Sequence, residues 1–353
     1  MYRDLASAVY KRGEASMNGY QVPGWAWGVL FLDFIVFLPF FLVVNYTFQH
    51  VFSTLAIIED PSPPAYEPLS LNDDTQSFAE DNAPVADEAA AGGETRAVTS
   101  SFRGIYRTLI SVGGWRSLFR GGACWFAASM ATAFLYGIFT AAWVPALVAA
   151  PLSALALVQL YTAWTHIVIS TPSPKRFWHR LPPFKKAFQA TALPVVVYFL
   201  ALELTSFLPK GLAYLIGMTT WDASQPGTIP EGDVNDIWKA VIVLLVSLVL
   251  HIFLVIPAQV VLTRVQASLL PEEDDTIVPF DRSFQSKVEP AIVGGKGFVS
   301  MIDAWKTFSR ASWTRLVKLY LKIFLASVGI SLLWVAVVVP EVLVIMSHSK
   351  KIE

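Results

Sequence analysis

The sequence predicts an all-α membrane protein with six transmembrane helices, and three observations support this fold class. The 353-residue chain is 54% hydrophobic and only 15% charged, with a mean hydropathy of +0.52, whereas a soluble domain of this size needs a more charged surface. Several apolar stretches reach the roughly 20 residues that cross a bilayer. Residues 121–174 contain no Asp, Glu, Lys or Arg, which leaves enough uncharged chain for two crossings.

The positions of the six spans follow from these stretches and from their breaks. Two prolines in "VPALVAAP" (144–151) interrupt the uncharged stretch, so we expect two helices joined by a tight turn there. The other four spans are expected at about 23–48, 187–217, 238–263 and 315–346. The chain then divides into a polar segment 1–22, three two-span units at 23–143, 144–217 and 218–346, and a tail 347–353.

Lys and Arg residues predict how these spans are oriented. With six spans, loops 49–121, 172–186 and 264–318 share one side of the membrane and carry 18 of these residues, against seven on the other side. The positive-inside rule places the richer side in the cytosol, or in the matrix of a mitochondrion.

Composition and motifs also exclude several classes of function. The net charge of −1 makes nucleic acid an unexpected partner. A lone cysteine, Cys124, excludes a disulfide framework and a multi-cysteine metal site. The chain carries no Walker loop, GxSxG, HExxH or paired-histidine metal spacing. We therefore expect neither catalytic residues nor a bound metal or cofactor, and the lipid bilayer is the first expected partner.

A few ionisable residues fall inside the expected spans and are candidates for a polar site in the centre of the bundle. An isolated charge at the bilayer centre costs about 2.5–3.5 kcal/mol or more, so such residues mark function or pair with one another. The structural alternative is a protonated carboxyl that is hydrogen-bonded between helices. The candidates are Asp33, Glu203, His251 and Lys322, with Glu341 near the end of the last span.

Proline recurs at matching positions in the first and fifth spans. When "PFFLVVNYTFQH" (39–50) is aligned with "PAQVVLTRVQAS" (257–268), Pro39 falls on Pro257 at the same distance from the polar end. Proline is expected to kink each helix, and Arg264 is expected to mark the point where the fifth span leaves the membrane.

Further matches extend this pattern into a repeat. "IYRTL" (105–109) and "AWKTF" (304–308) agree in character at every position, and "QLYTAWTHIVIS" (159–170) supplies a weaker middle unit. Three two-span units of about 100 residues each predict an internally repeated bundle.

These motifs resemble those of the mitochondrial carrier family over roughly residues 23–346. The resemblance implies a carrier-like bundle of three degenerate repeats. In each family repeat, a proline precedes an acid and two bases, and a later segment holds a glycine, an aromatic residue, a base and a second glycine. The residues at these motif positions are Pro39, Pro257, Gln259, Arg264, Gly114, Phe119, Arg120 and Gly121.

The chain departs from the family at the charged gate. Carriers place an acid and a base in each repeat, and these ion pairs close one gate. Here the acid positions hold Phe41, Tyr161 and Gln259, and the basic positions hold Val44, Trp164 and Leu262. The missing charges favour a divergent solute translocator or a membrane scaffold over a standard anion exchanger. The resemblance favours a mitochondrial membrane, with an endomembrane as the alternative.

An acidic loop offers a different function. Residues 59–95 carry ten acids and five prolines but no Lys or Arg, so we expect the loop 59–100 to be disordered. Within it, Pro63, Pro64 and Tyr66 form a PPxY sequence, the kind that WW domains bind as a polyproline II helix. The alternative function is therefore a membrane adaptor that recruits a WW-domain ubiquitin ligase.

A second resemblance, carried by "GYQVPGWAWGVL" and "VTSSFRGIYRTL", is to uncharacterised membrane proteins of filamentous fungi. Some members are labelled ubiquitin carrier proteins. A ubiquitin-conjugating enzyme needs a reachable thiolate, and Cys124 lies in an expected span. The sequence therefore gives that label no catalytic support.

Overall fold

The structure is a computed structural model, and it describes six parts of the chain. These are residues 20–21, 23–60, 97–218, 237–288, 294–348 and 350–351. Within these parts the regular secondary structure is helical, apart from an isolated bridge between Ser170 and Thr276 and one antiparallel pair. That pair joins β1 (Tyr20–Gln21) to β2 (Lys350–Lys351), so the two ends of the described chain meet.

Five helical segments of the described chain are long and apolar enough to cross a membrane. They are Gly24–Ile58, Trp115–Ala141, Phe184–Leu215, Ile237–Ala267 and Arg310–His348. Two further helices, α6 (Ala146–Ala156) and α7 (Val158–Ile169), pass the same test together but meet at a bend of 62°. They raise the number of candidate spans to six if the bent pair is one span. The protein therefore has the helices of an integral membrane protein.

The first segment is longer than the sequence suggests. It continues without a break through α2 (Gly24–Leu42), η1 (Val43–Phe52) and α3 (Ser53–Ile58), where the expected span stops at residue 48. All six residues of α3 are buried. The polar residues near position 48, which suggested the end of the span, form hydrogen bonds within the protein. The Thr47 hydroxyl, for example, donates to the carbonyl of Leu118 at 3.0 Å.

Both repeated prolines lie beside π-helical turns. Pro39 is inside α2, four residues before η1, which is a π-helix. Pro257 opens α10 (Ile256–Ala267) directly after a second π-helix, η6 (His251–Val255), which follows α9 (Ile237–Leu250). A proline ring removes one backbone donor and blocks the regular bond to the preceding turn, and widened turns absorb that defect.

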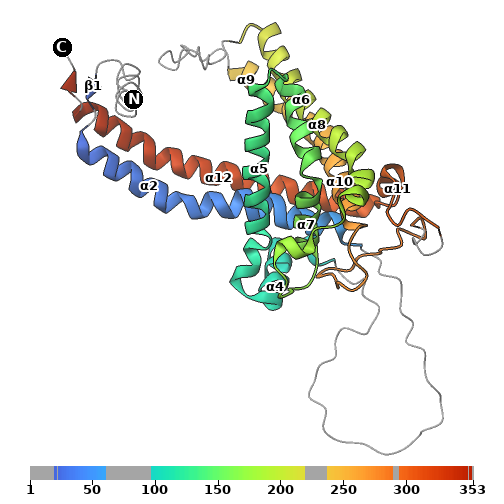
Figure 1. Cartoon of the computed structure of the whole chain (residues 1–353). Coiled ribbons are helices and arrows are strands. Elements are labelled where there is room, and N and C mark those ends of the chain that lie inside the picture. The colour runs from blue at the N-terminus through green and yellow to red at the C-terminus, as the bar shows by residue number, and fades with distance from the viewer. Residues whose placement is uncertain are drawn as a thin grey trace, which may run out of the picture.

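The helices converge at one end of the molecule and diverge at the other (Figure 1). α2 and α12 (Arg310–His348) run side by side and leave the convergent end in a different direction from α5 (Gly122–Ala141), α6, α8 (Phe184–Leu215) and α9. Short elements surround the convergent end: η2 (Val98–Ser100), α4 (Phe102–Gly113), η3 (Trp115–Phe119), η4 (Phe177–Arg180) and α11 (Met301–Lys306).

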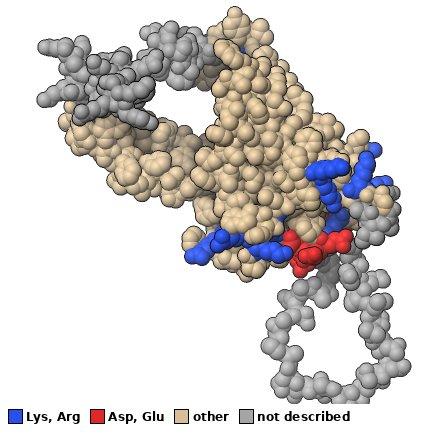
Figure 2. Space-filling view, viewed as in Figure 1, with Lys and Arg blue, Asp and Glu red and all other residues tan. Residues whose placement is uncertain are grey.

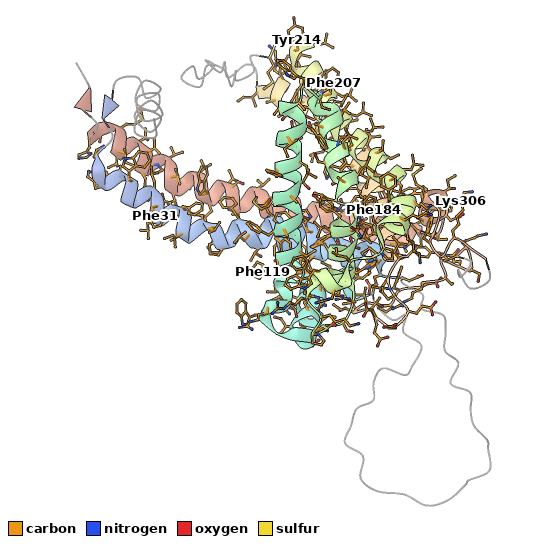
Figure 3. The ribbon with its side chains drawn as sticks, in the orientation of Figure 1. Phe31, Phe119, Phe184, Phe207, Tyr214 and Lys306 are labelled. Carbon is orange, nitrogen blue, oxygen red and sulfur yellow. The ribbon has the colours of Figure 1, made fainter. Side chains whose placement is uncertain are left out.

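Charged residues and exposed apolar residues occupy different parts of the molecule: the convergent end and the helical shafts, respectively. Figure 2 shows the Lys, Arg, Asp and Glu residues gathered at the convergent end, while the helical shafts are almost free of them. Large apolar side chains point outward from the shafts (Figure 3), among them Phe31 at 63% exposed, Phe207 at 71% and Tyr214 at 84%. Such surfaces suit lipid contact rather than water.

The main hydrophobic core lies at the convergent end. Phe52, Leu55 and Ile58 of the first segment pack there with residues from the other helix ends. The fully buried partners are Ile105 and Leu109 of α4, Ile169 of α7, Ile256 of α10 and Leu316 of α12. Because interiors of this kind are close-packed, this end is the part of the bundle best able to hold a site in one geometry.

Candidate functional site

A cavity of about 180 Å³ lies where the helices converge. Its wall comes from η1, α3, α5, α6, α7, α8 and α10. The lining residues are His50, Thr54, Trp125, Ala154, Val158, Tyr161, Trp164, Val195, Tyr198, Phe199, Gln259, Leu262, Thr263 and Gln266. No Asp, Glu, Lys or Arg is among these described residues, so the wall combines aromatic surface with uncharged hydrogen-bonding groups.

Several of these polar groups are already bound to the protein. The hydroxyls of Tyr161 and Thr132 are 2.7 Å apart. Tyr320 on α12 donates to Oε1 of Gln259 at 2.8 Å, so α12 also contacts the wall. Thr165 donates to Oε1 of Gln266, also at 2.8 Å. These bonds hold each side chain in one orientation without any ion pair.

Three polar groups on the wall remain free to bind a ligand. Among the described residues, none bonds to the imidazole nitrogens of His50, the amide nitrogen of Gln259 or the hydroxyl of Tyr198. Together they offer hydrogen-bond donors and acceptors. They come from η1, α10 and α8, so a ligand that binds all three would link separate helices.

Aromatic rings surround His50 and fix its position. Its ring centroid lies 5.4 Å from Trp125, 5.9 Å from Trp164 and 6.2 Å from Tyr46. The indole nitrogen of Trp164 donates to the Tyr46 hydroxyl at 3.1 Å, and that hydroxyl donates to the carbonyl of Arg120. The His50 ring is therefore surrounded by the aromatic rings of Tyr46, Trp125 and Trp164.

The positions that the carrier resemblance assigns to the gate are found partly on this wall. Tyr161, Trp164, Gln259 and Leu262 line the cavity, whereas Phe41 and Val44 do not. Four of the six residues at the expected ion-pair positions thus line one cavity whose described wall carries no Asp, Glu, Lys or Arg.

The four predicted intramembrane candidates do not meet in this cavity. Asp33 lies on α2 against Glu341 of α12, and Glu203 is half-buried on α8. His251 is exposed on η6, with its ring 6.3 Å from that of Tyr320, and Lys322 is exposed on α12. Of these, the structure brings only Asp33 into contact with another carboxyl.

Most of the predicted motif residues lie at the convergent end of the molecule. Arg264, 6% exposed, donates through Nε to the carbonyl of Ala304 and through Nη2 to the hydroxyl of Thr307, both at 3.0 Å. Its guanidinium lies over two rings, 4.9 Å from the centre of Phe284 and 5.5 Å from that of Phe308. Arg264 is in the last turn of α10, as expected of an exit, but it is buried in protein.

Gly121 lies at the convergent end, directly against the cavity-lining residue Trp164. It has φ +71° and caps α5, and a Cβ added to it would lie 2.9 Å from Cδ1 of Trp164. Phe119 stacks on Tyr46 with centroids 6.4 Å apart. Gly114, with φ +65°, makes the turn between α4 and η3. These glycines therefore allow the chain to turn back closely under the cavity wall.

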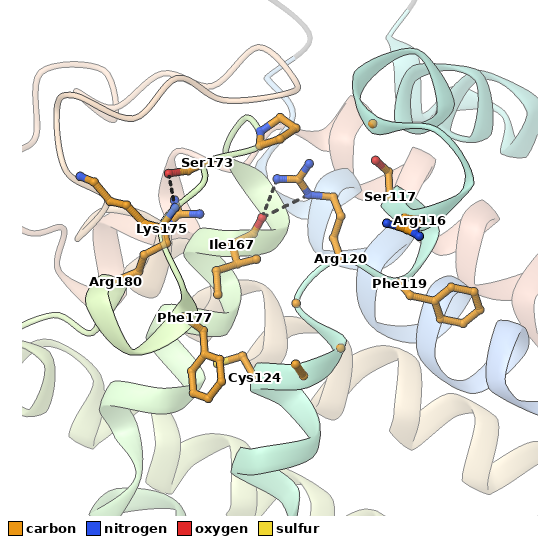
Figure 4. A pocket seen from close by; sticks show the side chains of 15 residues that line it. Arg116, Ser117, Phe119, Arg120, Cys124, Ile167, Ser173, Lys175, Phe177 and Arg180 are labelled. Carbon is orange, nitrogen blue, oxygen red and sulfur yellow. Dashed lines mark hydrogen bonds between the residues drawn. The ribbon is translucent and has the colours of Figure 1, made fainter.

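A second, larger hollow of about 430 Å³ lies on the surface of the convergent end (Figure 4). Its basic residues are Arg116, Arg120, Lys175 and Arg180, and no carboxylate is among its described lining residues. Arg120 donates to the carbonyls of Ile167, at 3.0 Å from Nη2, and Ser170. The first turn of α5 also lines the hollow, so its potential favours anions.

Sequence reasoning missed His50, Trp125 and Tyr198. His50 follows the polar run "NYTFQ", which resembles the end of a span, and Trp125 and Tyr198 look like ordinary lipid-facing aromatic residues. Gln259, a polar residue inside an apolar helix, was the one sequence feature that pointed to this cavity wall. Pro63, Pro64 and Tyr66 of the PPxY sequence lie outside the described residues.

No protein-family model, characterised protein or solved structure matches this chain. The resemblance to mitochondrial carriers therefore rests on the sequence motifs and stays a prediction.

Proposed function

We propose that this protein is a divergent solute translocator of carrier-like architecture that binds a small uncharged solute in the convergent cavity. The observation that carries the proposal is the chemistry of the wall. It is aromatic and uncharged, and His50, Tyr198 and Gln259 offer hydrogen bonds that the described residues leave unused. Buried polar groups are normally paired, so free groups on a cavity wall favour a ligand or water.

The volume limits the size of the solute. A cavity of about 150 Å³ can hold benzene, with six carbon atoms, so about 180 Å³ suits on the order of seven non-hydrogen atoms by proportion. An anionic substrate is disfavoured because no described cation lines the cavity, and a desolvated carboxylate without a partner is costly. A pure scaffold would have no use for such a wall.

Uptake by purified protein in liposomes tests the proposal. The probes are labelled glycerol and acetamide as small neutral solutes, with succinate as the anion. We expect saturable uptake of at least one neutral probe. Gln259→Leu should reduce it about five- to tenfold, the loss of about one hydrogen bond. His50→Leu should also reduce uptake, since His50 lines the cavity. Its matched control, His251→Leu on an exposed histidine, should leave uptake unchanged.

Two outcomes would reject this function. Succinate exchange at rates above those of the neutral probes would mean that the missing ion pairs do not exclude anion transport. Absence of uptake and of binding for every neutral probe would favour the scaffold. The PPxY adaptor remains the alternative proposal, because it depends on a different segment and is tested separately.

A further inference from the structure

Two carboxyl groups face each other in the arm formed by α2 and α12. The helices run antiparallel (Figure 1), and their register brings the Trp25 ring to 6.0 Å from the ring of His348. Eight residues further along α2, the carboxyl of Asp33 lies beside that of Glu341. Asp33 is nine residues into α2, about 14 Å at 1.5 Å per residue, which is close to mid-depth of a 30 Å hydrocarbon core.

This pair lacks a nearby cation. Asp33 is the only ionisable residue of α2, and the outer part of α12 adds only Glu341 and His348. The His348 ring is bound at Nδ1 to the carbonyl of Val344 at 2.9 Å. Lys322 lies 19 residues from Glu341, about 28 Å along the helix, and is exposed. The ion pairs Arg180–Asp274 and Arg315–Glu59, in which both residues are described, are at the convergent end.

Each carboxyl also keeps one oxygen without a partner. Asp33 is 9% exposed, and its Oδ2 and the Oε2 of Glu341 are buried with no hydrogen bond from the described residues. Two ionised carboxylates repel each other when they share a site of low polarity. A hydrogen bond between them can form only when at least one carries a proton, since an ionised carboxylate is only an acceptor.

We infer that Asp33 and Glu341 form a proton-binding site that holds α2 against α12. One proton bonds to an oxygen of one carboxyl and is donated to an oxygen of the other. Release of this proton leaves two negative charges at the contact, which drives the two helices apart. The ligand is the proton, and the site is separate from the convergent cavity, so the inference goes beyond the proposed translocation of solute.

Infrared spectroscopy of the protein in lipid nanodiscs tests proton binding. At pH 7 the wild type should show a hydrogen-bonded protonated carboxyl band that shifts in D₂O. The band should disappear in the double variant Asp33→Asn with Glu341→Gln, whose amides preserve shape and hydrogen bonding. Glu203→Gln, which changes the half-buried carboxyl of α8, is the control and should retain the band.

Spin labels test the consequence for the arm. Labels at Phe31→Cys and Leu343→Cys, both on exposed positions, are introduced after Cys124→Ala. With Asp33 and Glu341 intact, the distance between the labels should increase over the same pH range in which the infrared band disappears. In the amide double variant, this distance should not change with pH. A missing band, a band that survives the double variant, a band lost on adding Na⁺ at constant pH, or a pH-independent separation in the wild type would overturn the inference.

Discussion

Arg315 of α12 binds Glu59 at the end of α3 across 256 residues of chain. Its Nη1 lies 3.5 Å from Oε2 of Glu59, and its Nη2 donates to the Glu59 carbonyl at 2.8 Å. The same carboxylate accepts from the backbone nitrogens of Val98 and Thr99, at 2.6 and 2.9 Å. One glutamate thus joins the first helical segment, the last helix and the point where the acidic loop returns.

Loss of this glutamate should destabilise the fold strongly. Glu59 is 2% exposed, so Glu59→Ala would leave a buried guanidinium without its carboxylate, at a cost of about 3–5 kcal/mol. Thermal unfolding in detergent, followed by a thiol-reactive dye on buried Cys124, measures the loss. Glu272→Ala, on an exposed residue, should stay within about 0.5 kcal/mol. A loss below 1 kcal/mol at Glu59 would contradict this account.

Lysine should not replace Arg264. A lysine cannot bond to the Ala304 carbonyl and the Thr307 hydroxyl in the same planar arrangement, and it stacks less well between two rings. Arg264→Lys should lower the free energy of unfolding by about 2 kcal/mol, from lost charged hydrogen bonds and cation–π contact. The matched control, Arg310→Lys, changes an exposed arginine and should have no measurable effect. Equal stability of both variants would disprove the role of the guanidinium.

Two glycines of the same helix region should respond oppositely to alanine. Gly121→Ala would force a side chain into φ +71° and against Trp164, with an expected loss of about 1–3 kcal/mol. Gly137 has no atom within 4 Å of an added Cβ, so Gly137→Ala should be neutral or stabilise by up to about 1 kcal/mol. The same thermal assay compares them, and similar losses would refute the close approach.

Filling the cavity should block the solute while the bundle stays folded. Ala154 is buried on α6 and lines the cavity, and Ala154→Leu adds three carbon atoms to that space. Overpacking costs about 1–3 kcal/mol, and solute uptake should fall at least tenfold. Ala146→Leu makes the same change at an exposed position of α6 and should transport normally. Undiminished uptake by the Ala154 variant would place the solute elsewhere.

The PPxY sequence should bind WW domains as an isolated peptide. Residues 61–68 contain four prolines, which restrict the backbone before binding, so affinity in the micromolar range, about −8 kcal/mol, is expected. Tyr66→Ala should weaken binding about tenfold or more in a titration, whereas Ala65→Ser should change little. Unchanged binding after Tyr66→Ala, or protease protection showing that the loop faces the matrix, would reject the adaptor function.

The sequence by itself determined which stretches become apolar helices. Hydropathy and charge act locally along the chain, so the expected last span, 315–346, lies within α12, and the expected fifth span ends within α10. The first helical segment runs ten residues past the expected end of the first span, through the polar run before His50 that suggested the end of the span. Protein carbonyls, such as that of Leu118, bind these polar groups in place of water.

Only the tertiary structure decided which polar groups meet. Asp33 and Glu203 have similar settings in the sequence, each a lone acid in an apolar stretch, yet the register of α2 on α12 gives Asp33 a carboxyl partner. The packing of several helices likewise placed His50 beside Trp125 and Gln259 on one wall. Hydrophobicity is a property of each residue, whereas a hydrogen bond or a cavity depends on distances between residues far apart in the chain, and only packing sets those distances.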